Sequence, residues 1–247
     1  MKKIIKIKIE DYLMNEYNCS KEQLSGDNLF FTIKTDVENS FVKIFIYNNS
    51  LGVCSSEVLS PKLNEMLEGK SRDEIFELPL VYGQTIHYVP SDCFNDSQIK
   101  TDLGMKFNYQ FFIDKEIQPL QAISGFDNSL SFDSKGDTDT KAVYIIKDKG
   151  EVVAVAGAAE TSIDGFWEVG IDVLEKYRKF HLGTELVSRL TQELLKRRIV
   201  PFYSASVTNI ASQRLAIRAG YVPVWVDTYS NIFDGNYIYT DMLKNSL

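Results

Sequence analysis

A strand that runs through a short basic loop into a long amphipathic helix constrains the fold of this chain most. Leu182, Leu186, Leu190 and Leu194 recur every four residues, which places them on one face of a helix of about four turns. The segment Phe166–Val173, before the loop, follows a turn at Asp164-Gly165 and has the composition of a strand. A strand followed by such a helix is a unit of helix-covered sheets, so the sequence predicts an α/β fold.

Other segments extend this prediction along the chain. Strands are expected at 29–34, 41–47, 107–113, 142–147, 152–159, 201–207, 221–226 and 236–242, and helices at 60–68, 115–123 and 211–219. The alternation in the first 13 residues is interpreted as a strand rather than a signal peptide. A mixed sheet flanked by helices is therefore predicted for a domain at 108–247. A smaller α+β domain is predicted at 1–107, and the sequence assigns it no function.

Composition excludes several classes of partner. Lys and Arg total 27 against 34 acidic residues, a net charge of −7, so neither nucleic acid nor an anionic membrane surface is expected as a partner. Cys19, Cys54 and Cys93 form no CxxC pair and only two histidines accompany them, so no metal site is expected. The longest apolar run, 152–159, is far shorter than the ~20 residues of a membrane span. A soluble cytoplasmic protein is expected.

Positive charge gathers around the predicted helix. Residues 176–198 contain seven basic and two acidic side chains, a local charge of +5. A helix start offers free backbone N–H groups and the positive end of the helix dipole, and both favour a bound anion. Lys176, Arg178 and Lys179 precede the helix, where basic residues are unfavourable without an anion. They are interpreted as anion ligands, whereas the basic residues at 196–198 equally suit the negative end of the helix.

These residues resemble a known family. The run Arg178-Lys179-Phe180-His181-Leu182-Gly183 is similar to the Q/R-x-x-G-x-G/A motif of the GNAT superfamily of acyl-CoA-dependent N-acetyltransferases. The family's later features follow in order: a strand at 203–207, Asn209, a helix, and Gly220-Tyr221. The resemblance covers about residues 108–247.

The resemblance implies acetyl-CoA as the cosubstrate and a set of residues that bind it. The backbone of the loop and helix start would cradle the pyrophosphate, which implicates Arg178, Lys179, Phe180, His181, Leu182, Gly183 and Thr184. Asp172 and Val173 would lie where their strand splays from the strand at 203–207, and the N–H near Val173 would polarise the thioester carbonyl. Asn209 and Ser212 would bind the pantetheine arm or the phosphate. A plain helix N-cap is the alternative for Asn209.

The implied reaction is direct attack of an amine on the thioester. A base must accept the amine proton, and Glu168 and Asp172 lie four residues apart on one strand face, so either is a candidate. A covalent route is not expected, because no cysteine lies in the C-terminal half. The acceptor is expected to be a small-molecule or peptide amine, and the acidic balance favours a cationic one.

Two positions depart from the family pattern. His181 stands where the family has its middle glycine, which is costly if that position needs a positive φ. Ala216 stands where the family often has a tyrosine that protonates the leaving thiolate, although Tyr203 and Tyr221 are close in sequence. The alternatives are an acyl-CoA-binding sensor or interaction module without catalysis, and a structural protein with a generic anion site. Residues 1–107 would shape the acceptor pocket or a homodimer interface.

Overall fold

The computed structural model describes residues 2–35, 41–78, 81, 83–94, 107–178 and 180–229, and the backbone of 231–232. Lys179 and the strand predicted at 236–242 lie outside the described residues.

The chain divides into two compact units that are each discontinuous in sequence. Unit 1 comprises Met1–Lys8, Tyr88–Ala205 and Asn209–Pro223, and unit 2 comprises Ile9–His87, Ser206–Thr208 and Val224–Leu247. The division predicted at 107/108 does not coincide with these units. Residues 1–8 and 88–107 belong to unit 1, and residues 206–208 and 224–247 belong to unit 2.

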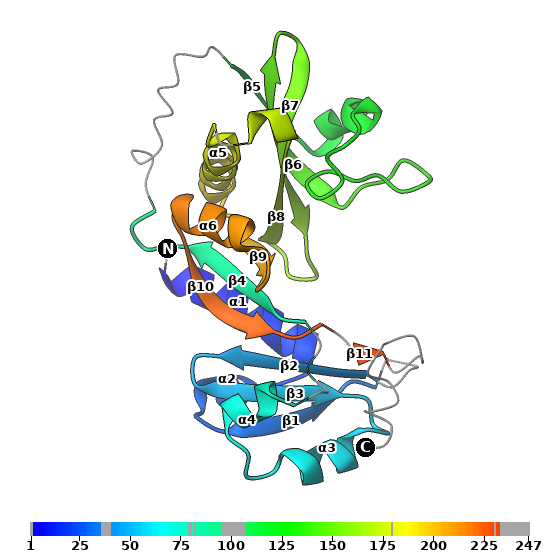
Figure 1. Cartoon of the computed structure of the whole chain (residues 1–247), viewed down its shortest axis with the longest axis vertical. Coiled ribbons are helices and arrows are strands. Elements are labelled where there is room, and N and C mark those ends of the chain that lie inside the picture. Colours follow the sequence, from blue (N-terminus) through cyan, green and yellow to red (C-terminus); the bar gives the residue numbers. More distant parts are fainter. Residues whose placement is uncertain are drawn as a thin grey trace. The chain divides into compact units, whose positions relative to one another are not determined.

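Unit 1 contains a mixed sheet with both antiparallel and parallel strand pairs. Its strand order is β4-β9-β8-β7-β6-β5 (Figure 1). β5 to β8 pair antiparallel, and β8 pairs parallel with β9. The bounds are β4 (Thr85–Pro90), β5 (Asn108–Ile113), β6 (Thr140–Asp148), β7 (Glu151–Glu160), β8 (Phe166–Val173) and β9 (Val200–Ser206). β10 (Tyr221–Asp227) lies next to β4.

Helices cover both faces of this sheet. α5 (Leu182–Lys196) lies on one face, and the 3₁₀ helix η2 (Asp114–Ala122) with the loop that follows it lies on the other (Figure 1). The four leucines at 182, 186, 190 and 194 are buried, as their spacing predicts. The short 3₁₀ helix η3 (Glu175–Tyr177) precedes α5, and α6 (Ile210–Arg218) follows β9. The predicted mixed sheet flanked by helices is confirmed.

The first residues form a helix, so the strand predicted there is wrong. α1 (Lys2–Tyr17) buries Ile5, Ile9, Leu13 and Tyr17, which follow one another at intervals of four. This repeat coexists in the sequence with an alternation of Ile and Lys. These residues form a helix because the four-residue repeat continues to Tyr17, whereas the alternation of Ile and Lys stops after Ile9.

Unit 2 packs short helices on a second set of strands. In order, β1 (Leu29–Ile33), β3 (Ser50–Ser55) and β2 (Phe41–Tyr47) are neighbours, and β2 also pairs with the last residues of β10 and with β11 (Asn231–Ile232). The helices are α2 (Lys21–Ser25), α3 (Ser60–Leu67) and α4 (Arg72–Phe76). Leu63, Leu67 and Ile75 pack on the buried strand residues to form the core. β3 and β4 have no counterpart among the predicted strands.

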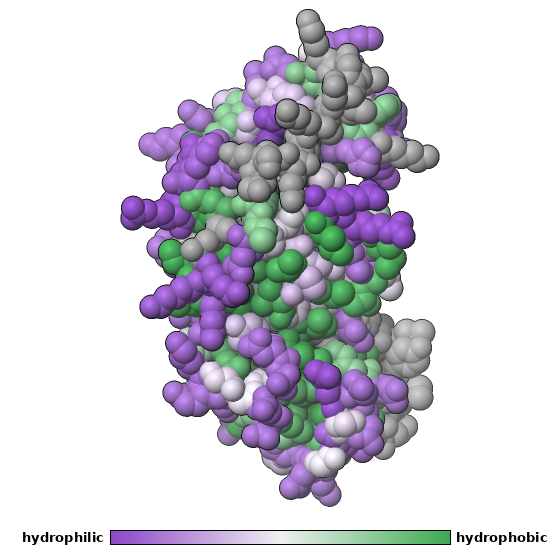
Figure 2. All heavy atoms as spheres, turned by 90° about the vertical axis from the view of Figure 1, so that its left-hand side faces the viewer, coloured by the Kyte–Doolittle hydropathy of each residue, from purple (hydrophilic) through white to green (hydrophobic). Residues whose placement is uncertain are grey.

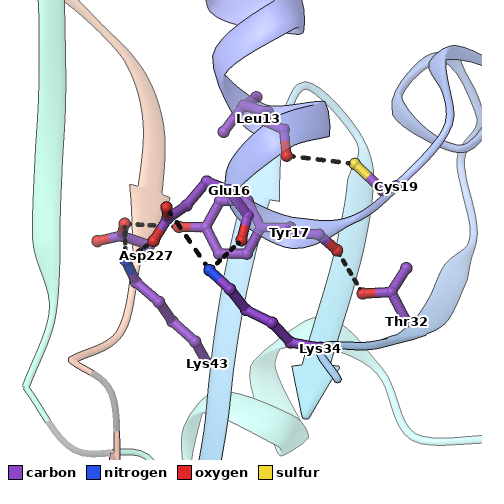
Figure 3. Close-up of polar contacts among 8 residues, drawn as sticks. All are labelled: Leu13, Glu16, Tyr17, Cys19, Thr32, Lys34, Lys43 and Asp227. Carbon is purple, nitrogen blue, oxygen red and sulfur yellow. Dashed lines mark hydrogen bonds and ion pairs between the residues drawn. The ribbon is translucent and has the colours of Figure 1, made fainter. Parts of the chain in front are cut away.

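A buried carboxylate ties several elements of unit 2 together. Asp227 of β10 accepts a hydrogen bond from the hydroxyl of Tyr17 at 2.7 Å, and Lys43 of β2 places its Nζ 3.2 Å from the same oxygen (Figure 3). His87 lies on the other carboxylate oxygen at 3.0 Å and stacks on Trp225. Burial alone would raise the pKa of Asp227, but His87, Lys43 and Tyr17 together hold that pKa below its usual value.

The surface mixes apolar and charged side chains. Among the described residues, Ile4 and Ile7 of α1, Ile210 and Ile217 of α6, and Val222 are exposed. Figure 2 shows apolar surface bordered by charged side chains on the face that it presents. A search of the described helices finds none with the length and apolar character needed to cross a membrane.

Candidate active site

The parallel strands β8 and β9 stop pairing halfway along β8. Their register runs from Phe166 opposite Val200 to Val169 opposite Tyr203. From Gly170 to Val173, β8 keeps its register with β7, and no pair with β9 is found over these described residues. The last four residues of β8 therefore have one backbone edge on which no strand is found in the described part of the chain, called the uncovered edge below.

The backbone of Val173 directs its N–H group toward this uncovered edge. The N–H of Leu174 donates to the carbonyl of Val153 at 3.0 Å, so Val173 and its partner Ala154 form a non-hydrogen-bonded pair. The N–H and C=O groups of Val173, and those of Ile171 two residues earlier, consequently point away from β7. An N–H fixed in this way can stabilise negative charge on a carbonyl oxygen.

Side chains from two other segments reach the carbonyls on the same edge. Arg178 donates from Nε to the carbonyl of Val173 at 3.1 Å, and Asn128 donates from Nδ2 to the carbonyl of Ile171 at 3.1 Å. Both donors are on exposed residues. On the uncovered edge, the N–H of Val173 thus lies between the carbonyls of Ile171 and Val173. Both carbonyls already accept a hydrogen bond from a side chain.

The start of α5 lies against the end of β8. A Cβ atom on Gly183 would lie 3.4 Å from the side chain of Val173 and 2.8 Å from a terminal methyl of Leu215 in α6, so the start of α5 packs closely on both. Helix geometry leaves the N–H groups of Leu182, Gly183 and Thr184 without acceptors inside the helix. Together with the positive end of the helix dipole, these N–H groups give the start of α5 a preference for an anion.

His181 occupies the N-cap of α5 with a left-handed backbone. Its φ is +58°, and the N–H of Glu185 donates to its carbonyl at 3.1 Å. The position of the family's middle glycine therefore does require a positive φ, and a histidine there is strained. Its side chain is exposed.

Lys176, the other described basic residue before α5, has partners nearby. Lys176 lies 3.9 Å from Glu151 and over the ring of Tyr177, whose hydroxyl donates to Asp148. Phe180 is partly buried. Of the two described members of this basic group, Lys176 and Arg178, the structure thus places Arg178 beside the uncovered edge.

Asn209 forms the N-cap of α6, which is the alternative that the sequence left open. Its side chain accepts from the N–H of Ser212 at 3.1 Å. The hydroxyl of Ser212 lies 2.7 Å from that of buried Tyr203, at the last registered pair of β8 and β9. Ala216 is buried one helical turn after Ser212, on the same helix face.

The hydroxyl of Tyr221 contacts α5 rather than α6. Its hydroxyl lies 2.6 Å from that of Thr191 in α5, and complete burial raises the pKa of Tyr221 far above its usual value. Of the two tyrosines near Ala216 in sequence, Tyr203 is the one bonded to the first turn of α6.

The two candidate bases share a face of β8 but differ in their surroundings. Glu168 and Asp172 alternate with the residues that contact Gly183, so they lie on the face opposite α5. Asp172 accepts through one oxygen from both the N–H and the hydroxyl of Ser129, at 2.8 and 2.9 Å. Glu168 is exposed, and among the described residues its carboxylate has no hydrogen bond or ion pair.

Sequence reasoning missed the segment 126–130, which lies directly on this face. Gly157 and Gly170 are register partners on β7 and β8. A Cβ on Gly157 would meet the carbonyl oxygen of Ser129 at 1.7 Å, and one on Gly170 would meet that of Asn128 at 2.1 Å. Glycines inside two neighbouring strands are a signal of such a close backbone approach.

Comparison with known protein families identifies part of the chain. A family model described as GNAT acetyltransferase matches residues 113–229. Residues 113–229 form a GNAT acetyltransferase domain. The match lies within the predicted range of 108–247, and acyl transfer is the reaction class of the family.

Solved structures of GNAT proteins are similar to the chain at low identity. A GCN5-related N-acetyltransferase-like protein from Streptococcus suis shares 19% identity over 79% of this chain and 86% of its own, with a TM-score of 0.46. GNAT-family proteins from Novosphingobium aromaticivorans and Colwellia psychrerythraea share 15% and 10%, over 61% and 76% of this chain, with TM-scores of 0.44 and 0.45. The chain covers 65% and 64% of those two proteins. Comparison with curated proteins gave no match.

The candidate site of the GNAT domain consists of backbone groups and carboxylates. In the part of the chain that the structure describes, no group of three or more His, Cys, Asp or Glu side chains could hold a metal ion. The domain brings together a fixed N–H, a helix start and an exposed carboxylate.

Proposed function

We propose that this protein transfers an acetyl group from acetyl-CoA to an amine by direct attack. The observation that carries the proposal is the N–H of Val173, which points to the uncovered edge of β8 beside the start of α5. A thioester carbonyl bound at that N–H would lie within the GNAT domain, close to the anion site that suits a pyrophosphate.

The binding residues follow from the sequence prediction. The N–H groups of Leu182, Gly183 and Thr184 would hold the pyrophosphate, with Arg178 and Lys179 adding positive charge and Phe180 and His181 shaping the loop. Asn209 and Ser212 would contact the pantetheine arm from the first turn of α6. This assignment is supported by the place of Gly183 and Arg178 beside Val173.

The chemistry needs one base and one oxyanion donor. The amine nitrogen forms a bond to the carbonyl carbon, the bond from that carbon to sulfur breaks, and the amine proton passes to Glu168 directly or through a water. The N–H of Val173 stabilises the charge that develops on the carbonyl oxygen, and one such donor is worth about 10²–10³ in rate. The thiolate of CoA, with a pKa of about 8.5 by analogy to cysteine, can leave without an acid.

The positions of the cysteines support direct attack, and the net charge supports a cationic acceptor. Cys19, Cys54 and Cys93 all lie outside residues 113–229, so none is available in the matched domain as an acyl carrier. The net charge of −7 attracts cationic amines such as polyamines or basic peptides.

Thermal unfolding with and without acetyl-CoA tests the binding step. At about 100 times Kd a ligand stabilises a protein by about 2.7 kcal/mol, a rise of about 5–10 °C in Tm for a chain of this size. Arg178→Glu should reduce the rise, whereas Lys62→Glu, an exposed lysine of unit 2, should not. Absence of any rise at millimolar acetyl-CoA would refute the proposal.

An amine panel with detection of the released CoA thiol tests the transfer step. Polyamines, aminoglycosides, amino acids and basic peptides cover the acceptors that the charge favours. Turnover that Glu168→Gln reduces and whose pH dependence it changes would support the assigned base. A Tm rise without turnover of any amine would instead support the acyl-CoA-binding sensor.

A further inference from the structure

The segment 126–130 carries a polar side chain to the uncovered edge of β8. We propose that Asn128 contacts the acceptor amine where the acetyl group is transferred, and that Asp172 acts as the positioning residue that holds Asn128 there. This inference rests on the proposed function and adds to it a residue that recognises the acceptor.

The backbone of the segment is fixed by contacts on both sides. Phe126 and Leu130 are buried in an apolar cluster beneath η2, with Val143, Ile145 and Val155 among its members. Between them, the chain lies on the paired glycines of β7 and β8, where no side chain fits. A backbone packed this closely on a sheet cannot move without opening the cluster.

Asp172 joins the segment 126–130 to β8 through two hydrogen bonds. One carboxylate oxygen accepts from the N–H of Ser129 at 2.8 Å and from its hydroxyl at 2.9 Å. Charge-assisted bonds of this kind are about twice as strong as neutral ones. Because the bonds join the segment to the part of β8 that has lost β9, they fix Asn128 relative to Val173.

The carboxamide of Asn128 has a defined orientation on this edge. Its Nδ2 donates to the carbonyl of Ile171 at 3.1 Å, and a carbonyl can only accept, so Oδ1 is the atom that remains to accept. Ile171 precedes Val173 by two residues, and the backbone groups of both point away from β7. An amine that attacks a carbonyl held at Val173 has N–H groups to donate, and Asn128 is an exposed residue on the same edge whose Oδ1 can accept one of them.

The two carboxylates of β8 then have different tasks. Asp172 is engaged by Ser129, whereas the exposed carboxylate of Glu168 on the same face has no such contact among the described residues. Glu168 would accept the amine proton, and Asp172 would act through Asn128.

Steady-state kinetics with the amine found in the panel, together with the acetyl-CoA Tm shift, test this assignment. Asn128→Ala should raise the KM for the amine about tenfold, the effect of losing one hydrogen bond, and leave the acetyl-CoA Tm shift unchanged. Asp172→Ala should raise the same KM by a similar factor. Asp172→Asn, which keeps an oxygen to accept from Ser129, should recover most of the loss and leave the pH profile unchanged.

Asn49→Ala is the matched control, because Asn49 is an exposed asparagine of unit 2 whose side chain donates to Asp27. It should change neither KM nor kcat. An unchanged amine KM in Asn128→Ala would overturn the inference. So would an Asp172→Asn variant as impaired as Asp172→Ala with an altered pH profile, which would make Asp172 the base. Wild-type protein that fails to bind acetyl-CoA or to turn over any amine would overturn the proposed function and this inference together, a result distinct from the others.

Discussion

Replacing His181 by glycine should stabilise the protein, although it removes a side chain. His181 holds a φ of +58° at the N-cap of α5. A left-handed backbone costs an L-residue about 1–2 kcal/mol, and glycine avoids this cost. Glycine also increases the entropy of the unfolded chain by about 0.5–1 kcal/mol, which offsets part of the gain. The exposed imidazole contributes little packing, so a net gain of about 0.5–1 kcal/mol is expected.

A gain of this size corresponds to a rise in Tm of about 1–4 °C for a protein of this length, measurable by circular dichroism. His181→Ala is the control, because alanine removes the imidazole and keeps the strain. It should give no rise. If alanine stabilises the protein as much as glycine does, the imidazole rather than the backbone angle causes the cost, and the reasoning is refuted.

Two further predictions concern other parts of the chain. Gly157→Ala should lower the free energy of unfolding by about 1–3 kcal/mol in urea titration, because its Cβ would overlap the carbonyl of Ser129, whereas Gly26→Ala has room and should be nearly neutral. An equal effect of both would contradict the close contact. The second prediction concerns pH. The pKa of Asp227 is depressed in the folded protein, so its stabilisation is present above the unfolded pKa of about 3.9 and is lost as pH falls toward the folded value. The stability difference between wild type and Asp227→Asn should therefore shrink below about pH 4, and a constant difference would argue against the ion pair with Lys43.

The GNAT domain was predictable from sequence because its signals are local. β8 spans the predicted residues, and α5 begins at the leucine that opens the four-residue repeat. Gly183 and the short loop between β8 and α5 lie within a few residues of each other in the sequence. Periodicity and turn chemistry operate at this range, so they place the helix start and the strand end correctly.

The contacts that complete the candidate site were not predictable in the same way. Asn128 and Asp172 meet their partners across 43 residues of sequence, and the loop rich in Ser, Asp and Gly gave no periodic signal. Gly157 and Gly170 indicate a close backbone contact with the sheet. A glycine within a strand does not show which segment of the chain makes that contact. β4 was not predicted because it is short and ends at Pro90, and a proline weakens the sequence signal of a strand.

The bond between Tyr17 and Asp227 has a consequence for the order in which the protein is made. Its two residues are separated by 210 positions, and a ribosome adds about 5–20 residues per second, so about 10–40 s pass between their synthesis. During that interval Lys43 can pair only with Glu16 of its two carboxylate partners, and β2 has no β10 beside it. Unit 2 therefore begins to emerge before most of unit 1, and it can complete its set of strands only after β10 has been made.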